Sequence, residues 1–157
     1  MRRPAVRRPA ATRGLTLVEL MFVVAIVAVL VSLAVSGWGA WRNKIKTKTA
    51  VDDITALSLV IDDYYADKGE LPASLSDIGR AGMTDSWGAP YVYLDLTSTK
   101  GKGKARKDHS LVPLNSDYDL FSMGPDGKSA SPLTAASSRD DILRASNGRF
   151  IGVAADY

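Results

Sequence analysis

The feature that most constrains this chain is a run of 22 residues without a charged side chain, which extends from Leu20 to Trp41. As an α-helix the run measures about 33 Å, because each residue adds about 1.5 Å. The hydrocarbon core of a bilayer is about 30 Å thick. The sequence therefore predicts a membrane-spanning helix near the amino terminus.

Two other interpretations of this run stay open. A cleaved secretory signal peptide has an apolar region of about 7–15 residues followed by small residues at the cleavage site. Ala34-Val35-Ser36 and Ser36-Gly37 are weak sites of that kind, although the run itself is longer. The second interpretation is a plain signal anchor. Neither explains Glu19, because a carboxylate at the edge of a bilayer core costs free energy and usually marks a function or a partner.

The charge of the chain is unevenly distributed. The segment before Leu15 carries five arginines and no acidic residue. Without them, 15 Lys and Arg face 17 Asp and Glu, so the net charge falls from +3 to −2. The basic character belongs to this leader, and we expect no nucleic-acid partner. The chain has no cysteine, which excludes disulfides and cysteine-based zinc sites.

The segment Gly14-Leu15-Thr16-Leu17-Val18-Glu19-Leu20 resembles the processing motif of type IV prepilins and type II secretion pseudopilins. The resemblance implies that a prepilin peptidase cuts between Gly14 and Leu15, and that the new amino group of Leu15 is methylated. It also implies that Glu19, fifth in the mature chain, pairs with the amino terminus of a neighbouring subunit. Two paired charges cost less in a low dielectric than two isolated ones. Leu15 replaces the family's usual phenylalanine but keeps a large apolar side chain.

Helical spacing continues beyond the membrane run. One helix is predicted from Leu15 to Lys68, ended by Gly69 and then Pro72. Its second half is amphipathic, with apolar residues at intervals of three and four. These residues are Ile45, Ile54, Leu57, Ile61, Tyr64 and Tyr65. The adjacent acidic pairs between them, 52–53 and 62–63, are interpreted as a solvated helix face.

Turn and strand signals follow the helix. They predict a short helix over 74–79 capped by Ser74 with Asp77, a turn and then a strand within 87–94, and a strand over 118–123. They also predict a hairpin around Ser146-Asn147-Gly148, a solvated loop over 97–110 and a loop of small residues over 129–138. Three aromatic residues are expected in the core: Trp87, Tyr91 and Tyr93. The sum is an α+β, pilin-like fold in which a long helix packs on a small antiparallel sheet. We expect a leader over 1–14, a membrane and assembly helix over 15–41, and a globular domain over 42–157.

Three segments in order resemble the major pseudopilin of type II secretion systems more closely: 67–72, 85–93 and 118–127. The resemblance implies a single-pass protein of the bacterial inner membrane whose carboxy-terminal domain lies in the periplasm, and a pseudopilus after extraction. The implied partners are further copies of the chain, prepilin peptidase, minor pseudopilins and the inner-membrane secretion platform. A count of five positive residues before the run against four after it favours this orientation only slightly.

The same resemblance implies a calcium site in the carboxy-terminal loop. The matching ligands are the carbonyl of Met123 and the carboxylates of Asp126, Asp140 and Asp141. Calcium takes 6–8 oxygen ligands, so three carboxylates with carbonyls and water suit it. In the opposing interpretation Asp126 serves a Pro-Asp-Gly turn and the other two lie on a solvated surface. Both interpretations stay open, because residues 129–139 form a longer stretch than the family has.

Catalytic chemistry has little support in this sequence. His109 is the only histidine and belongs to a basic loop, where solvation is the simpler interpretation. The basic run over 100–107 lacks interleaved aromatics, and no nucleotide-binding lysine motif is present. We therefore expect a structural subunit of a secretion pseudopilus and not an enzyme. The alternatives are a type IV pilin for adhesion, motility or DNA uptake and, from another class, a membrane-anchored periplasmic binding protein or enzyme.

Overall fold

A computed structural model describes residues 14, 16–98 and 102–157 of the chain. Its elements are α1 (Leu17–Lys68), β1 (Val92–Asp95), β2 (Tyr118–Ser122), β3 (Ile142–Ala145), β4 (Phe150–Val153) and the 3-10 helices η1 (Lys102–Lys104), η2 (Ala136–Ser138), η3 (Ser146–Gly148) and η4 (Ala154–Asp156). The chain divides into two compact units, Met1–Trp41 and Arg42–Tyr157.

The first unit contains the amino-terminal part of α1. Its large apolar side chains whose exposure is described, from Leu17 to Trp41, are 51–75% exposed. The helix is long and apolar enough to cross a membrane. A helix that is apolar all round has to be buried in something else, either lipid or other protein. The predicted helix is confirmed from Leu17 onward, and Leu15 and residues 1–13 lie outside the described part of the chain.

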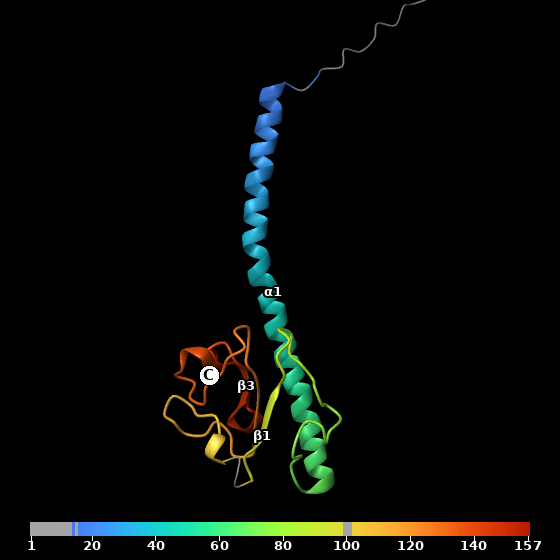
Figure 1. The fold of residues 1–157 in the computed structure, drawn as a ribbon, viewed down its shortest axis with the longest axis vertical. Coiled ribbons are helices and arrows are strands. Elements are labelled where there is room, and N and C mark those ends of the chain that lie inside the picture. Colours follow the sequence, from blue (N-terminus) through green and yellow to red (C-terminus); the bar gives the residue numbers. More distant parts are fainter. Residues whose placement is uncertain (1–13, 15, 99–101) are drawn as a thin grey trace, which may run out of the picture. The chain divides into compact units, whose positions relative to one another are not determined.

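The second unit packs the rest of α1 on one face of a four-stranded sheet (Figure 1). The strands follow one another in the order β1-β2-β3-β4, and each pair is antiparallel. The buried residues between helix and sheet are Ala50, Ile54, Leu57, Ile61, Tyr91, Tyr118, Leu120 and Ile142. Trp87 and Tyr93 pack against them, so the predicted aromatic core is confirmed. The α+β prediction is confirmed as well.

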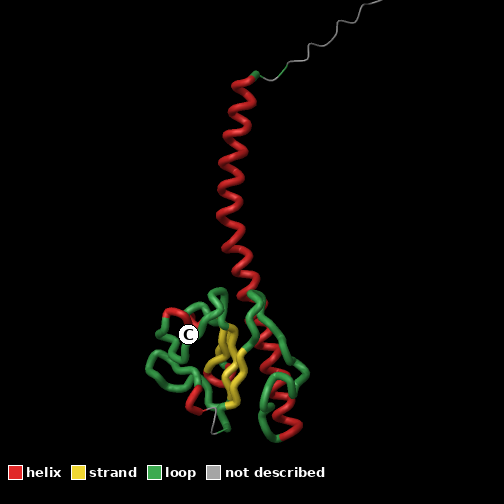
Figure 2. The backbone as a smooth tube through the Cα atoms, in the orientation of Figure 1, coloured by secondary structure: helices red, strands yellow, loops and turns green. Residues whose placement is uncertain are grey.

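Loops cover the opposite face of the sheet, so this unit has three layers (Figure 2). The buried residues of this second cluster are Leu114, Leu133, Leu143, Ala145 and Ala154. Successive side chains of a strand point to opposite faces. Ile142 therefore lies in the cluster beside α1, and Leu143 lies under the loops.

Local turn chemistry explains where several elements end. Gly69, which follows α1, has a φ of 76°, a conformation that glycine adopts without strain. The hairpin predicted around Ser146-Asn147-Gly148 is confirmed as β3 and β4. The short helix predicted over 74–79 is wrong, because residues 75–79 form consecutive turns. The predicted cap contact is present nevertheless, since the Ser74 N–H donates to Asp77 Oδ2 at 2.9 Å.

The solvated interpretation of the acidic helix face is wrong for Asp53, which is half-buried, whereas Asp62 is exposed as predicted. Asp53 accepts a hydrogen bond from the Tyr91 hydroxyl at 2.8 Å, and Asp62 accepts one from the Tyr118 hydroxyl at 3.1 Å. A tyrosine at the edge of a core buries its ring and needs a partner for its hydroxyl. These two carboxylates supply that partner.

The apolar residues at helical spacing in the second half of α1 are not all covered. Ile45 and Tyr65 are exposed, whereas Ile54, Leu57 and Ile61 are buried. The spacing alone does not say how far along α1 the sheet extends.

Candidate functional site

The start of α1 carries the residues of the processing motif. The backbone N–H and the hydroxyl of Thr16 both donate to Glu19 Oε2 at 2.9 Å. In return, the Glu19 N–H donates to Thr16 Oγ1 at 3.2 Å. This reciprocal arrangement is a capping box, which satisfies N–H groups that have no partner inside the helix. It also holds the Glu19 carboxylate against Thr16, the second residue after the predicted cleavage junction.

The cleavage junction itself is only partly described. A Cβ added at Gly14 would meet no atom of the described residues within 4 Å. Leu15 lies outside the described residues. Cleavage between Gly14 and Leu15, methylation of Leu15 and pairing of Glu19 with another subunit therefore stay predictions.

The structure brings together two of the four predicted calcium ligands, Asp126 and Asp140. The Asp126 N–H donates to Asp140 Oδ2 at 3.2 Å, and Asp126 Oδ1 accepts from the Lys128 N–H at 2.8 Å. Gly124, next to Met123, approaches the Asp140 backbone so closely that a Cβ there would lie 2.2 Å from the Asp140 carbonyl oxygen. The turn after β2 and the segment before β3 are thus neighbours.

Asp141 does not join this group. Its side chain is 0% exposed, and its Oδ2 lies 2.7 Å from Arg106 Nη2 and accepts from the Ser129 hydroxyl at 2.7 Å. Burial raises the pKa of Asp141 to about 6, against the opposing effects of Ser129 and Arg106. Within the described part of the chain, no three acidic, histidine or cysteine side chains are placed to hold a metal ion. The implied ligand set does not fit around one cation here, and calcium binding stays a prediction.

Arg106 is a residue whose role the sequence pattern did not reveal. The solvated interpretation of residues 97–110 is wrong at this position, because Arg106 is 4% exposed. Its N–H donates to Asp119 Oδ2 at 2.7 Å, and its guanidinium lies over the Phe121 ring at 4.3 Å. It also donates through Nη1 to the Ser129 hydroxyl. Burial is the main cause that raises the pKa of Asp119.

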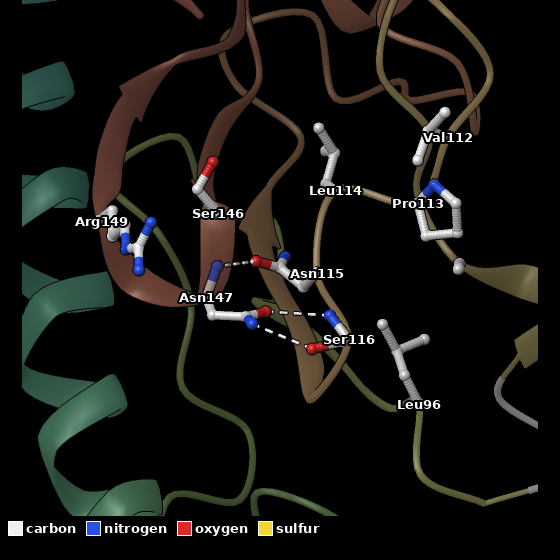
Figure 3. A pocket seen from close by; sticks show the side chains of 10 residues that line it. Leu96, Val112, Pro113, Leu114, Asn115, Ser116, Ser146, Asn147 and Arg149 are labelled. Atoms are coloured by element: carbon white, nitrogen blue, oxygen red, sulfur yellow. Dashed lines mark hydrogen bonds between the residues drawn. The ribbon is translucent and has the colours of Figure 1, made fainter.

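A hollow of about 800 Å³ lies beside the hairpin of β3 and β4 (Figure 3). Asn147, with a φ of 54°, joins the hairpin turn to the loop before β2. Its N–H donates to Asn115 Oδ1, its side-chain amide donates to Ser116 Oγ, and its Oδ1 accepts from the Ser116 N–H, each at 2.9 Å. The described residues that line the hollow include no carboxylate, histidine or lysine, so they offer no general acid–base pair. His109 is exposed, as predicted.

Comparison with known proteins finds relatives over most of the chain. Type II secretion system core protein G of Klebsiella pneumoniae is 31% identical over 134 residues, which cover 83% of this chain and 91% of the relative. Its namesake in Escherichia coli (strain K12) is 32% identical over 121 residues, 74% of this chain and 83% of the relative. A fimbrial protein of Neisseria meningitidis is 30% identical over 73 residues, 46% of this chain and 43% of the relative. No family model and no solved structure matches the chain.

The fold, the apolar amino-terminal helix and these relatives together define a pseudopilin or pilin: a structural subunit that assembles into a filament within a secretion system, and not an enzyme. Within that class, the chain belongs to the family of type II secretion system core protein G. The family resemblance seen in the sequence is thereby confirmed. The alternative of a membrane-anchored enzyme is excluded by this membership.

Proposed function

We propose that the chain is the repeating subunit of a periplasmic pseudopilus that drives protein export by a type II secretion system. The observation that carries this proposal is the contrast within α1. Its first part exposes large apolar residues all round, while its second part belongs to a unit with its own core. A helix of the first kind needs lipid before assembly and other copies of itself afterwards.

The proposed pathway begins in the inner membrane. The leader with its five arginines stays on the cytoplasmic side, and residues 42–157 lie in the periplasm. Prepilin peptidase cuts between Gly14 and Leu15, and the new amino group of Leu15 is methylated. The sequence motif supports this step.

The proposed assembly contact is between Glu19 and the Leu15 amino group of a neighbouring copy. Both hydrogen bonds from Thr16 end on Oε2 of Glu19. None of the described residues donates to the second carboxylate oxygen, Oε1, so an ammonium group can bind there while the helix cap stays intact. An ion pair formed in this way lowers the cost of keeping two charges in lipid.

The remaining proposed partners are those that a pseudopilus needs for its assembly. Minor pseudopilins start the filament, and the inner-membrane platform extracts subunits from the bilayer. The chain has no nucleotide-binding lysine motif, so the energy has to come from another protein.

Processing can be tested in a secreting strain that lacks its own copy of this subunit. Gly14→Val is expected to leave the leader attached and to stop export, while Ala11→Val serves as the matched control within the leader. Because a Cβ at Gly14 meets no atom within 4 Å, the substitution does not disturb the described fold. Normal cleavage and normal export with Gly14→Val would overturn the proposal.

A second candidate is a type IV pilin for adhesion, motility or DNA uptake. The similarity to the Neisseria meningitidis fimbrial protein favours it. Deleting the subunit separates the two functions. Loss of export supports the pseudopilus, whereas loss of surface filaments with intact export supports the pilin.

A further inference from the structure

The face of the sheet that lies away from α1 contains a buried cation supplied by the chain itself. The guanidinium of Arg106 is 4% exposed, and its Nη2 lies 2.7 Å from Oδ2 of the fully buried Asp141. We propose that Arg106 takes the place that the family resemblance assigns to a calcium ion. It balances the charge of Asp141 and ties the loop after β2 to the sheet.

Arg106 is placed to connect the loop after β2 with the sheet. Its own backbone N–H bonds to Asp119 of β2, its guanidinium covers Phe121 of the same strand, and Nη1 reaches Ser129 in the loop after β2. Asp141 lies directly before β3. One side chain therefore joins the loop before β2, the strand itself and the loop after it, in a chain without cysteine.

Arg106 and a divalent cation would compete for the same carboxylate. An arginine keeps its positive charge under all ordinary conditions. A calcium ion bound to Asp141 would share that carboxylate with a fixed positive charge in a poorly solvated region, where like charges repel strongly. The other carboxylate oxygen of Asp141, Oδ1, is buried and has no hydrogen-bond partner among the described residues. It is therefore the Asp141 oxygen that is left to bind an ion. The guanidinium on Oδ2 disfavours a dication there.

The other implied ligands are engaged in the turn they build. Asp140 Oδ2 accepts from the Asp126 N–H, and Asp126 Oδ1 accepts from the Lys128 N–H. Such bonds fix the turn without an ion. The exposed carboxylate of Asp126 and the half-buried carboxylate of Asp140 are a poor set for calcium, which prefers 6–8 oxygen ligands.

The experiment compares the full processed chain in detergent, freed of metal by chelator, with and without added calcium. Thermal unfolding is followed by near-ultraviolet circular dichroism. We expect the same Tm in both conditions. Arg106→Met is expected to lower the Tm by about 10 °C or more, because it leaves Asp141 buried and unpaired. Arg139→Met, an exposed arginine of the neighbouring loop, is the matched control and is expected to leave the Tm unchanged.

A double variant distinguishes the ion pair from simple packing. Arg106→Met combined with Asp141→Leu removes both charges and is expected to recover much of the lost Tm. Two results would overturn the proposal: a Tm of the wild-type chain that rises with calcium, or an Arg106→Met variant as stable as the control. Should Arg106→Met not fold, equilibrium dialysis of calcium against the wild-type chain decides instead. One bound ion per chain that is lost in Asp141→Asn contradicts the proposal, and no bound ion supports it. The result is independent of the export assay.

Discussion

The apolar amino-terminal part of α1 and the unit over residues 42–157 differ in how their apolar side chains are buried. Residues 17–41 of α1 keep large apolar side chains that are 51–75% exposed wherever their exposure is described, and none of them belongs to a described core cluster. Residues 42–157 enclose two clusters, one on each face of a sheet. The apolar side chains of the first part can be buried only by lipid or by other protein, whereas those of the second part bury one another.

This difference separates two kinds of substitution. Changes in residues 42–157 alter the free energy of unfolding, because their contacts lie inside the chain. Under the proposed function, changes at the start of α1 are expected to alter processing and assembly instead, because the partners of these residues lie outside the chain.

The largest effect on folding is expected at the turn after β2. Gly124 and Gly127 share a φ of 64°, but only a Cβ at Gly124 would meet a backbone atom, the Asp140 carbonyl oxygen at 2.2 Å. Gly124→Ala is expected to destabilise the chain by about 4 kcal/mol or more, through strain and a clash. Gly127→Ala, with open space around it, is expected to cost about 1 kcal/mol. Chemical unfolding of both variants checks this, and equal losses would show that the close approach to Asp140 is absent.

A smaller effect distinguishes two leucines of α1. Leu57 is 2% exposed and belongs to the core, whereas Leu59, two residues later, is 62% exposed. Leu57→Ala is expected to cost about 2–5 kcal/mol, and Leu59→Ala less than about 0.5 kcal/mol. The same unfolding measurement tests the pair. A Leu59→Ala variant as unstable as Leu57→Ala would mean that this face of the helix is covered by something else.

The smallest effect appears only at alkaline pH. Burial raises the pKa of Tyr118 to about 12, and burial also raises the pKa values of Tyr91 and Tyr93. A phenol whose folded pKa lies above its unfolded value of about 10 holds its proton more tightly in the folded chain. Its contribution to stability is therefore present below pH 10 and is lost as the pH rises toward 12, by up to about 1.4 kcal/mol per pH unit for each tyrosine.

This alkaline loss can be measured by chemical unfolding between pH 8 and about pH 11. Tyr118→Phe, which lacks the titrating group, is expected to show a shallower loss with pH than the wild-type chain. An identical slope in the two proteins would contradict the assignment.

The features predicted correctly from the sequence are those set by local patterns. The long uncharged run, the helical spacing around Leu57 and the Ser146-Asn147-Gly148 turn each depend on residues close together in the chain. The capping box is equally local, since the Thr16-to-Glu19 spacing predicts it, although Glu19 was interpreted only through its role between subunits.

The features that sequence patterns did not predict depend on distant partners. Arg106 meets Asp119, Ser129 and Asp141, which lie 13 to 35 positions further along the chain. The run over 100–107 that contains it consists mostly of lysines and glycines, which are typical of a solvated loop. The burial of Arg106 becomes visible only once the sheet and the loops that cover it are in place.

The measurement that tests the account most directly is the intact mass and amino-terminal sequence of the mature protein from membranes. The account predicts a chain that begins at Leu15, carries one added methyl group and retains all of α1. A chain that still begins with the leader would contradict processing. A chain that begins after Ala34-Val35-Ser36 would have lost the apolar helix, and would contradict the proposed filament subunit altogether.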